Sequence, residues 1–290
     1  MSQVCDRKHK MASVPLNKSC NTEYKSTAAI KYIATCIQSG NIHNIITLCG
    51  AGISTAAGIP DFRTPSTGLY AHIKCLYPGM RKPELLFDIR HFKRDPTRFY
   101  RIIKQLFSQS DYKPTKTHKF IKLLADHGLL LRDYTQNIDG LQEMLDMSKE
   151  LVVNSHGSFS TAHCIKCGSN FSIVEVKACI QRECVPRCTL CQGAVKPDIT
   201  FYGEQLPPRF YEMSKLDFPK CDLLIVLGTS ISVLPFDTLL SLVPLAVPCL
   251  FINLEKCSTF NIEGNSTHRM FLGTTDTGCQ ALADELGWGQ

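Results

Sequence analysis

The sequence predicts an α/β fold, in which a mostly parallel sheet lies between layers of helices. Short apolar runs rich in β-branched residues alternate along the chain with segments whose apolar residues recur at helical spacing. Strands that are apolar on both faces are typical of parallel sheets covered by helices. A polar, cysteine-rich stretch between about residues 157 and 196 breaks this alternation. We therefore expect a parallel sheet with helices on both faces and a smaller, separately stabilised module inserted into it.

The helix and strand signals follow one another in a regular order. Apolar residues at helical spacing run from Ser26, a plausible N-cap, to Ile37, and Gly40 follows as a stop signal. A second helix is expected at 118–127 and a closing helix at 281–286, before Gly287. The expected strands are 45–48, 129–134, 151–153, 222–227 and 249–253.

Composition sets the broad class of protein. With 290 residues, 44% of them hydrophobic and 20% charged, the chain can bury a large core and is not mainly disordered. The longest apolar stretch, 239–254, contains two prolines and is shorter than the ~20 residues that span a bilayer, so we expect no membrane partner. We assign residues 26–290 to one domain, made of a sheet part (26–156 and 197–290) and the inserted module (157–196).

Charge and cysteine content narrow the partners and the compartment. Residues 1–25 carry five basic and two acidic side chains, which supplies +3 of the net charge of +6, and we expect them to form a flexible basic tail. The remaining surplus is too small to predict direct nucleic-acid binding. Fifteen cysteines without a secretory signal favour a reducing intracellular compartment. Cytoplasm, nucleus and mitochondrial matrix all remain open, as does the oligomeric state.

Two C-x2-C pairs provide the most specific signal in the sequence. Twenty residues separate Cys164 and Cys167 from Cys188 and Cys191, which is the spacing of a tetrathiolate zinc site. Four thiolates close the tetrahedron and leave no position for a substrate, so the predicted zinc is structural. Four buried or disulfide-bonded cysteines are the alternative. The nearby His163, Cys179 and Cys184 lack a partner at this spacing, and we expect surface or packing roles for them.

A glycine-rich turn, GAGIS at 50–54, follows the first expected strand, where parallel sheets bind nucleotide phosphates. The usual dinucleotide fingerprint has glycine where Thr55 stands, and the next glycine here is Gly58. This spacing argues against an ordinary hydride-transfer dehydrogenase. In the motif GIPDFR that follows, Arg63 can offer a charged fork to phosphate and Phe62 can shield a reactive carbon from water. A plain turn with a solvated arginine explains the fragment equally well.

Polar residues follow two further strands. The motif TQNIDG at 135–140 supplies side-chain amides that can hold an amide ligand, and His156 follows the strand at 151–153. An imidazole with a pKa near 6.5 suits a general base at neutral pH. Considered alone, each of the nine histidines is more often structural.

Taken together, the motifs resemble the sirtuin family of NAD-dependent protein deacylases. The resemblance runs from about Ser26 to Trp288. Within the family the chain is most similar to class I, and DFP at 217–219 and LGW at 286–288 are similar to the mitochondrial member of that class. The ordered motifs that carry it are GAGIS, GIPDFR, TQNID, HG at 156–157, the two C-x2-C pairs, VKPDI at 195–199, FYGE at 201–204, GTS at 228–230 and IN at 252–253.

The resemblance implies a Rossmann-type sheet, a zinc module and NAD as a consumed co-substrate. The acyl-lysine oxygen attacks the nicotinamide ribose as nicotinamide leaves, and His156 then acts as the base while the acyl group migrates to ADP-ribose. Asn137 and Asp139 would complete the catalytic set, and Phe62 would act as a lid. The acyl-lysine peptide would lie between segments 196–204 and 230–235. The implied NAD contacts are Gly50, Ala51, Gly52, Ile53, Ser54, Asp61, Phe62, Arg63, Tyr70, Gln136, Asn137, Ile138, Asp139, Gly228, Thr229, Ser230, Asn253, Leu254 and Thr274.

Several positions depart from the family pattern. Thr200 and Tyr202 stand where an aliphatic residue and phenylalanine are usual, which bears on acyl preference, while Leu254 and Thr274 bear on affinity for the adenosine end of NAD. The Tyr-x-x-Arg pair of relatives that accept acidic acyl groups is absent between Gly68 and Pro83, so we expect acetyl and other uncharged acyl groups. Mono-ADP-ribosyl transfer to protein and a non-catalytic reader of acylated tails are the alternative functions.

Overall fold

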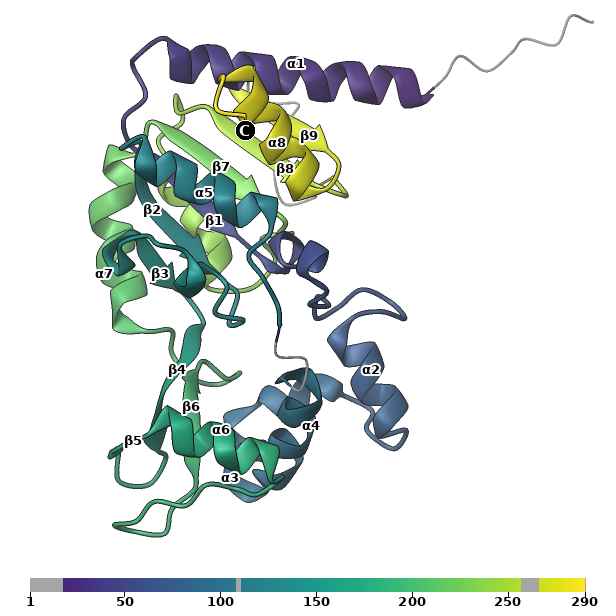
Figure 1. Ribbon diagram of the computed structural model, residues 1–290, viewed down its shortest axis with the longest axis vertical. Coiled ribbons are helices and arrows are strands. Elements are labelled where there is room, and N and C mark those ends of the chain that lie inside the picture. Colours follow the sequence, from purple (N-terminus) through teal and green to yellow (C-terminus); the bar gives the residue numbers. More distant parts are fainter. Residues whose placement is uncertain (1–17, 108–110, 257–265, 290) are drawn as a thin grey trace, which may run out of the picture.

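The computed structural model describes residues 18–107, 111–256 and 266–289. It contains a six-stranded sheet in the order β3-β2-β1-β7-β8-β9, in which all neighbouring strands pair in parallel. The predicted α/β fold with a parallel sheet is therefore confirmed (Figure 1). The strands are β1 (Ile45–Cys49), β2 (Leu130–Thr135), β3 (Val152–Asn154), β7 (Leu223–Leu227), β8 (Cys249–Asn253) and β9 (His268–Leu272).

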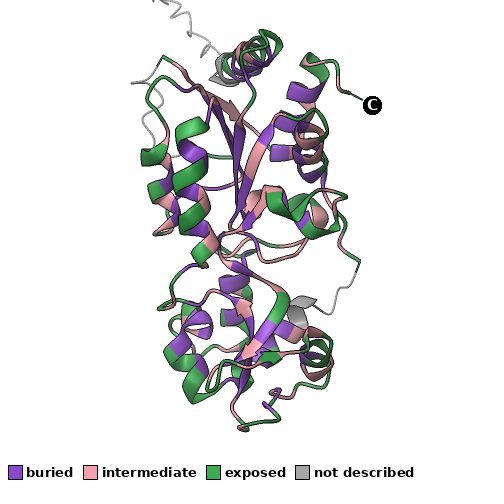
Figure 2. Ribbon diagram, turned by 90° about the vertical axis from the view of Figure 1, so that its left-hand side faces the viewer, coloured by how far each residue is buried: buried purple, intermediate pink, exposed green. Residues whose placement is uncertain are grey.

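Helices cover both faces of this sheet, as predicted. One face packs against α1 (Lys18–Gln38), α5 (Lys116–Asp126) and α8 (Thr275–Glu285). The other face packs against α7 (Pro208–Asp217) and the 3-10 segment Phe236–Leu242. Strand β1 shows why both faces are covered. Successive side chains of a strand point to opposite faces, so Ile45 and Cys49 pack in the first core, and Ile46 and Leu48 pack in the second. Strands β1 and β7, in the middle of the sheet, are accordingly buried throughout between the helical layers (Figure 2).

Three elements of the sheet part differ from the sequence prediction. Helix α1 begins at Lys18, so residues 18–25 are helical and not a flexible tail; residues 1–17 lie outside the described part of the chain. Ser26 is inside this helix, and its hydroxyl accepts a hydrogen bond from the Leu272 backbone N–H at 3.2 Å. The closing helix begins at Thr275, because Thr274 caps it through the Thr277 N–H. Strand β9 was missed because its five residues are all only partly buried.

The inserted segment contains more regular structure than the sequence indicated. Strands β4 (Gly157–Cys164), β5 (Asn170–Phe171) and β6 (Val195–Ile199) form an antiparallel sheet beside α6 (Ile173–Gln181). Helix α6 buries Val176 and Ile180, four positions apart, on one face, and this short pattern was not recognised as a helix within the polar, cysteine-rich stretch.

The smaller module also recruits a segment from earlier in the chain. Helices α2 (Leu69–Leu76), α3 (Ile89–Arg94) and α4 (Thr97–Phe107) lie in the lower part of Figure 1 with the smaller module, and α4 packs against α6. The sequence places this segment in the sheet part, but its buried side chains share a core with residues of the inserted module. Phe92, Phe99 and Phe201 lie at the centre of that core, in edge-on and tilted contacts with centroids 5.1–5.4 Å apart. Aromatic contacts therefore join α3 and α4 to the segment that follows β6.

Strand order determines where a ligand can bind. The chain leaves β1 toward β2 on one side and returns to β7 on the other, so β1 lies at a switch in strand order. Cys49, at the end of β1, is in register with Thr135 and Leu227, and Thr135 with Asn154. The loops after these strands meet at one edge of the sheet, where open α/β sheets bind ligands. Within the described ranges, no helix combines the length and the apolarity that crossing a bilayer requires.

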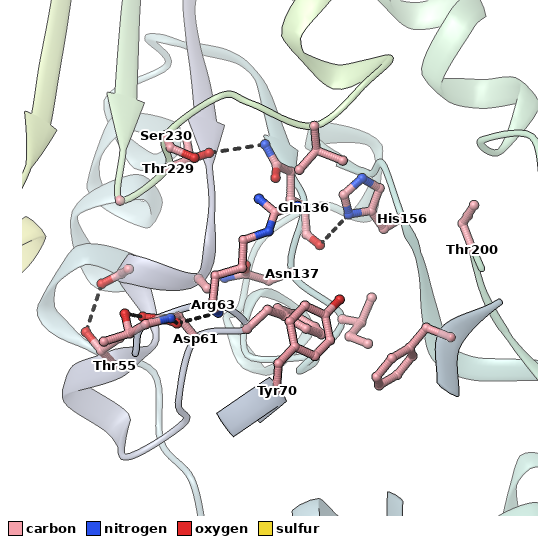
Figure 3. Close-up of a pocket in the computed structure, with 18 of the residues that line it drawn as sticks. Thr55, Asp61, Arg63, Tyr70, Gln136, Asn137, His156, Thr200, Thr229 and Ser230 are labelled. Carbon is pink, nitrogen blue, oxygen red and sulfur yellow. Dashed lines mark hydrogen bonds between the residues drawn. The ribbon is translucent and has the colours of Figure 1, made fainter. Parts of the chain in front are cut away.

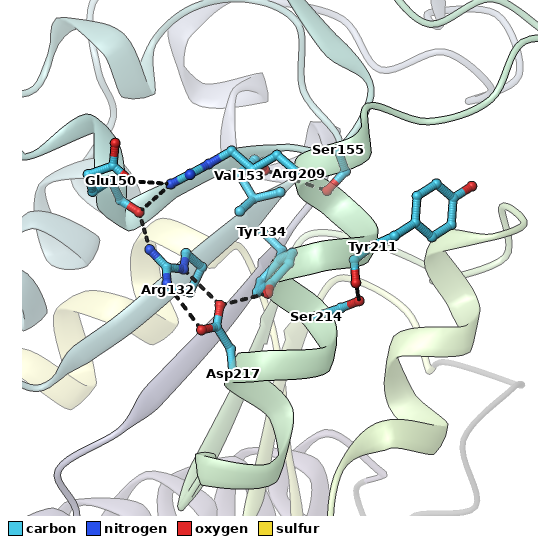
Figure 4. Close-up of polar contacts among 9 residues, drawn as sticks. All are labelled: Arg132, Tyr134, Glu150, Val153, Ser155, Arg209, Tyr211, Ser214 and Asp217. Carbon is cyan, nitrogen blue, oxygen red and sulfur yellow. Dashed lines mark hydrogen bonds and ion pairs between the residues drawn. The ribbon is translucent and has the colours of Figure 1, made fainter.

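A buried ion pair joins β2 to α7 at the outer part of the sheet (Figure 4). Asp217 accepts hydrogen bonds from Arg132 Nε at 2.7 Å and Nη2 at 3.1 Å, and from the Tyr134 hydroxyl at 2.8 Å. The Arg132 and Arg209 guanidinium groups both donate to the Glu150 carbonyl oxygen. Asp217 is 2% exposed, so its charge depends on these partners.

Candidate active site

The loops after β1 and β7 touch each other through glycines. Gly52 N–H donates to the Gly228 carbonyl at 2.9 Å, and a Cβ on Gly52 would lie 2.7 Å from Gly228 Cα. A Cβ on Gly50 would lie 2.5 Å from Thr229 Cβ. Glycine is therefore required at both positions by close backbone approach, while Ala51 and Gly52 line the cleft described below.

A buried hydroxyl links the two motifs that follow β1 and β2. Ser54 Oγ donates to Asp139 Oδ2 at 2.7 Å and accepts from Asn137 Nδ2 at 3.2 Å. Asn137 Nδ2 also donates to the Gly50 carbonyl at 3.1 Å. The Asn137 amide is thereby held in one orientation, 7% exposed and facing the cleft. Asp139 acts on the cleft only through Ser54 and Asn137.

Arg63 reaches across the mouth of the same cleft (Figure 3). Asp61 holds the turn, because its Oδ1 accepts from the Arg63 and Thr64 N–H groups at 2.8 and 2.7 Å. Burial opposes the charge on Asp61, but hydrogen bonds from Thr64 and Arg63 outweigh it and lower its pKa. Arg63 Nη1 donates to Ser232 Oγ at 3.3 Å, so this exposed cation is aimed at the loop after β7. A cation here, beside the backbone of the glycine-rich turn, can bind phosphate.

His156 lies at the end of β3 and faces the cleft between the two sheets. Its Nδ1 lies 3.0 Å from the Gln136 backbone carbonyl, and Gln136 Nε2 donates to Thr229 Oγ1 at 3.2 Å. Burial lowers the pKa of His156, and the charge of Arg63 lowers it further, although the hydrogen bond to Gln136 acts in the opposite direction. The imidazole is therefore neutral at neutral pH and able to accept a proton.

The far wall of the cleft is formed by the end of β6. Thr200 N–H donates to the His156 carbonyl at 2.7 Å, which places the threonine next to the histidine. The buried Lys196 ammonium donates to the Ile199 carbonyl at 2.7 Å and pairs with Glu204 Oε2 at 3.1 Å, while Glu204 also accepts from Phe201 N–H at 2.8 Å. This ring of contacts fixes the bend that carries Thr200.

Most of the residues expected to bind NAD line this one cleft. Its lining includes Ala51, Gly52, Asp61, Phe62, Arg63, Tyr70, Gln136, Asn137, Ile138, Gly228, Thr229, Ser230, Asn253, Leu254 and Thr274, together with His156. Gly50, Ile53, Ser54 and Asp139 do not line it and stand behind those residues.

Sequence reasoning missed other lining residues, among them Thr64, Phe87, Leu206, Glu255 and Thr275. Thr275 Oγ1 donates to the Gly52 carbonyl at 3.2 Å, which ties α8 to the glycine turn. Thr64, Leu206 and Glu255 lie close to motifs already identified, whereas no sequence signal marked Phe87.

The four predicted zinc ligands come together in the smaller module. The sulfur atoms of Cys164, Cys167, Cys188 and Cys191 all lie within 4.8 Å of one another. Cys164 Sγ is 3.4 Å from Cys191 Sγ, and Cys167 Sγ is 3.7 Å from Cys188 Sγ. A tetrahedral site with Zn–S bonds of about 2.3 Å has sulfur atoms about 3.8 Å apart, so the cluster fits zinc.

The chain matches known proteins over most of its length. The Sir2 family model matches residues 50–235. The NAD-dependent protein deacetylase sirtuin-2 of Danio rerio is 42% identical over 273 residues, which cover 88% of this chain and 71% of that protein. The NAD-dependent deacetylase sir2A of Dictyostelium discoideum is 44% identical over 269 residues, which cover 89% of this chain and 52% of that protein. This chain therefore belongs to the Sir2, or sirtuin, family.

The NAD-dependent protein deacetylase sirtuin-3 of Mus musculus is 39% identical over 262 residues, covering 90% of this chain and 77% of that protein. Identities between 39% and 44% do not separate these relatives. The likeness to the mitochondrial member of class I stays a prediction.

Proposed function

We propose that this protein is an NAD-dependent protein-lysine deacetylase that transfers the acetyl group to ADP-ribose and releases nicotinamide. The single observation that carries the proposal is the neutral, oriented His156 imidazole, which faces the same cleft as the glycine turn, Arg63 and the Asn137 amide. Family membership and the printed names of the deacetylase relatives support it.

When bound, NAD supplies the ribose carbon to which the acyl-lysine oxygen adds as nicotinamide leaves. The protein's residues would position the two substrates and remove a proton from the ribose hydroxyl. Arg63 and the backbone of the turn at 50–54 would hold the phosphates, and Asn137, oriented by Ser54, would hold the nicotinamide amide. Because Nδ1 of His156 donates to a carbonyl, Nε2 carries the lone pair that accepts the ribose hydroxyl proton. Phe62, which packs against Tyr70 and Phe87, shields the reacting carbon from water.

The bound lysine would approach between the segment that follows β6 and the loop after β7. Thr200, Phe201 and Tyr202 on one side and Val233, Leu234 and Pro235 on the other line the cleft. The apolar lining favours acetyl and other uncharged acyl groups over acidic ones. Backbone hydrogen bonds to an extended peptide would give affinity with little demand on sequence.

Zinc would be held by Cys164, Cys167, Cys188 and Cys191 and would stabilise the smaller module. Four thiolates fill a tetrahedral zinc ion, so the metal would take no part in the reaction. Its influence on catalysis would be indirect, because Cys164 ends β4, which pairs with β6.

We also propose an intracellular location. None of the twelve cysteines whose side chains the structure describes forms a disulfide, and four of them make up the proposed zinc site, which supports a reducing compartment. Of the alternative functions, mono-ADP-ribosyl transfer has no feature of its own among the described cleft residues to favour it, and the oriented His156 disfavours a non-catalytic reader.

The direct test is a product assay with zinc-loaded protein, NAD and an acetyl-lysine peptide. The expected products are nicotinamide, free-lysine peptide and O-acetyl-ADP-ribose in equal amounts. Radiolabel from the adenylate of NAD that stays on protein would favour ADP-ribosyl transfer instead, and no nicotinamide release would reject both activities.

A further inference from the structure

A second pair of cysteines, outside the four-cysteine cluster, lies at the end of α6. Cys179 is in the last turn of the helix and Cys184 follows its end. Their spacing alone does not predict a pair, because four residues separate them instead of the two of a zinc knuckle.

Backbone geometry brings these two residues together. Cys184 N–H donates to the Cys179 carbonyl at 3.0 Å, and Glu183 N–H donates to the Ile180 carbonyl at 3.0 Å. Glu183 has φ of 57°, in the left-handed region. These two bonds around a left-handed residue define a Schellman cap, in which the side chains at the first and last positions contact each other. In α6 both of those positions are cysteine.

The side chains agree with this arrangement. Arg182 Nη2 donates to Cys179 Sγ at 3.7 Å, and burial and then the neighbouring Cys184 raise the pKa of Cys179. The pKa of Arg182 is raised by its contacts with the Cys179 and Cys184 thiols, in that order. Both cysteines are partly exposed, so a small oxidant can reach them.

A salt bridge holds the cap in place. Glu183, which occupies an unfavourable left-handed conformation for a residue with a side chain, pairs with Lys104 Nζ of α4 at 2.9 Å. The ion pair links the cap to the neighbouring helix, and the two backbone hydrogen bonds of the cap hold Cys179 and Cys184 at its two ends.

We propose that Cys179 and Cys184 form an oxidisable dithiol, separate from the zinc ligands, that a peroxide converts to an intrachain disulfide. Peroxide oxygen adds to the Cys184 sulfur, giving a sulfenic acid and releasing one water. The Cys179 sulfur then attacks the Cys184 sulfur, the S–S bond forms, and the hydroxyl leaves as a second water with the Cys179 proton. The two thiols are oxidised by two electrons, and the peroxide is reduced to water.

The two cysteines have different roles in this sequence. Arg182 Nη2 donates to the Cys179 sulfur, which suits Cys179 to the resolving role, and burial, which raises its pKa, disfavours its thiolate before that step. Arg182 lies beside both sulfur atoms and can stabilise negative charge on the attacking one. A dithiol reductant would restore the pair.

Peptide mapping of the zinc-loaded, full-length protein tests the proposal. Trypsin cleaves after Lys177, Arg182 and Arg187, so a Cys179–Cys184 disulfide joins peptide 178–182 to peptide 183–187. After treatment with hydrogen peroxide and blocking of free thiols, we expect this linked pair, its loss on reduction, and unchanged zinc content. Recovery of both peptides unlinked, under conditions that release zinc, would overturn the proposal.

Substitutions separate the two roles. In Cys179→Ser, the Cys184 sulfenic acid has no resolving partner, so a cyclic 1,3-diketone that traps sulfenic acids should label Cys184 strongly, whereas the wild type shows little label. Cys75→Ser removes an exposed cysteine in α2 and serves as the control that leaves the linked peptides unchanged. Labelling of Cys184 at the same level in the wild type and in Cys179→Ser would contradict the resolving role. Deacetylation is measured separately, so failure of either proposal does not imply failure of the other.

Discussion

His156 Nδ1 lies 3.0 Å from the backbone carbonyl oxygen of Gln136. A carbonyl can only accept, so this contact places the imidazole proton on Nδ1 and leaves Nε2 as the free base. Gln136 is held in turn by the loop after β7, through Thr229. The reactive tautomer of His156 is thus set by the loops that follow two strands of the parallel sheet, β2 and β7.

The pH dependence of the reaction follows from this environment. Burial and Arg63 lower the pKa of His156, so the neutral base persists below its usual pKa of about 6.5. We expect kcat/KM to stay level from neutral pH to about 6.5 and to fall only as pH drops through the lowered value. An acidic limb centred above 6.5 would contradict the assignment. Stability should change in the same direction. The unfolded chain binds the His156 proton more readily than the folded chain does, so the free energy of unfolding should decrease as pH falls from about 6.5 through the lowered pKa.

The close contact between Gly52 and the loop after β7 predicts that even a methyl group at Gly52 is harmful. Gly52→Ala would place a Cβ 2.7 Å from Gly228 Cα, so the two loops must move apart, at a cost of about 1–3 kcal/mol in unfolding free energy. The KM for NAD should rise more than the KM for peptide. Gly79→Ala is the control, because a Cβ there meets nothing within 4 Å. Equal behaviour of the two variants in denaturant melts and NAD titrations would show that the close approach is unimportant.

The ion pair in Figure 4 predicts a large loss of stability. Asp217→Ala leaves the Arg132 guanidinium, 14% exposed, without its carboxylate, and removal of one partner from a buried pair costs about 3–5 kcal/mol. Asp126→Ala removes the exposed carboxylate of a helical pair with Lys122, where about 0.3–0.5 kcal/mol is expected. Urea unfolding of both variants measures the difference, and a loss below about 1 kcal/mol for Asp217→Ala would be inconsistent with a buried charge pair.

Metal content distinguishes the two sets of cysteines. Cys188→Ser should release zinc, because three thiolates hold the ion far less tightly, and it should lower both stability and deacetylation. Cys184→Ser should retain one zinc per chain and near-normal turnover. Metal analysis after gel filtration decides this. Full zinc content in Cys188→Ser, or loss of zinc in Cys184→Ser, would mean that the ligand set is wrong.

Substitution of Thr200 should change acyl preference and leave the chemical step intact. Thr200→Val keeps the shape and removes a hydroxyl from the cleft wall next to His156. We expect turnover of acetyl-lysine to change by less than about threefold, and the preference for longer, purely apolar acyl groups to rise, because the wall becomes less polar. A panel of acyl peptides measures this. Identical preferences in both proteins would show that Thr200 does not face the acyl group.

The sequence predicted the sheet and the cleft better than it predicted the smaller module. Strands such as Leu223–Leu227 are buried on both faces and leave a continuous apolar run, whereas β9 is partly exposed throughout and begins with His268 and Arg269, so only three apolar residues follow one another in it. The association of helices α2 to α4 with the smaller module was missed, because their partners across the aromatic core lie about a hundred residues later in the chain. The supporting role of Ser54 depends on the same kind of long-range contact, because its partner Asp139 lies 85 residues later in the chain.

The central claim is that His156 is the base that directs the acetyl group to ADP-ribose. The measurement is O-acetyl-ADP-ribose formed from NAD and an acetyl-lysine peptide by the wild type and by His156→Ala, each shown by denaturant melts to be folded. We expect stoichiometric product from the wild type, and a rate lower by about 10²- to 10⁴-fold in the variant with NAD binding largely retained. Product formation at the wild-type rate by His156→Ala would contradict the claim.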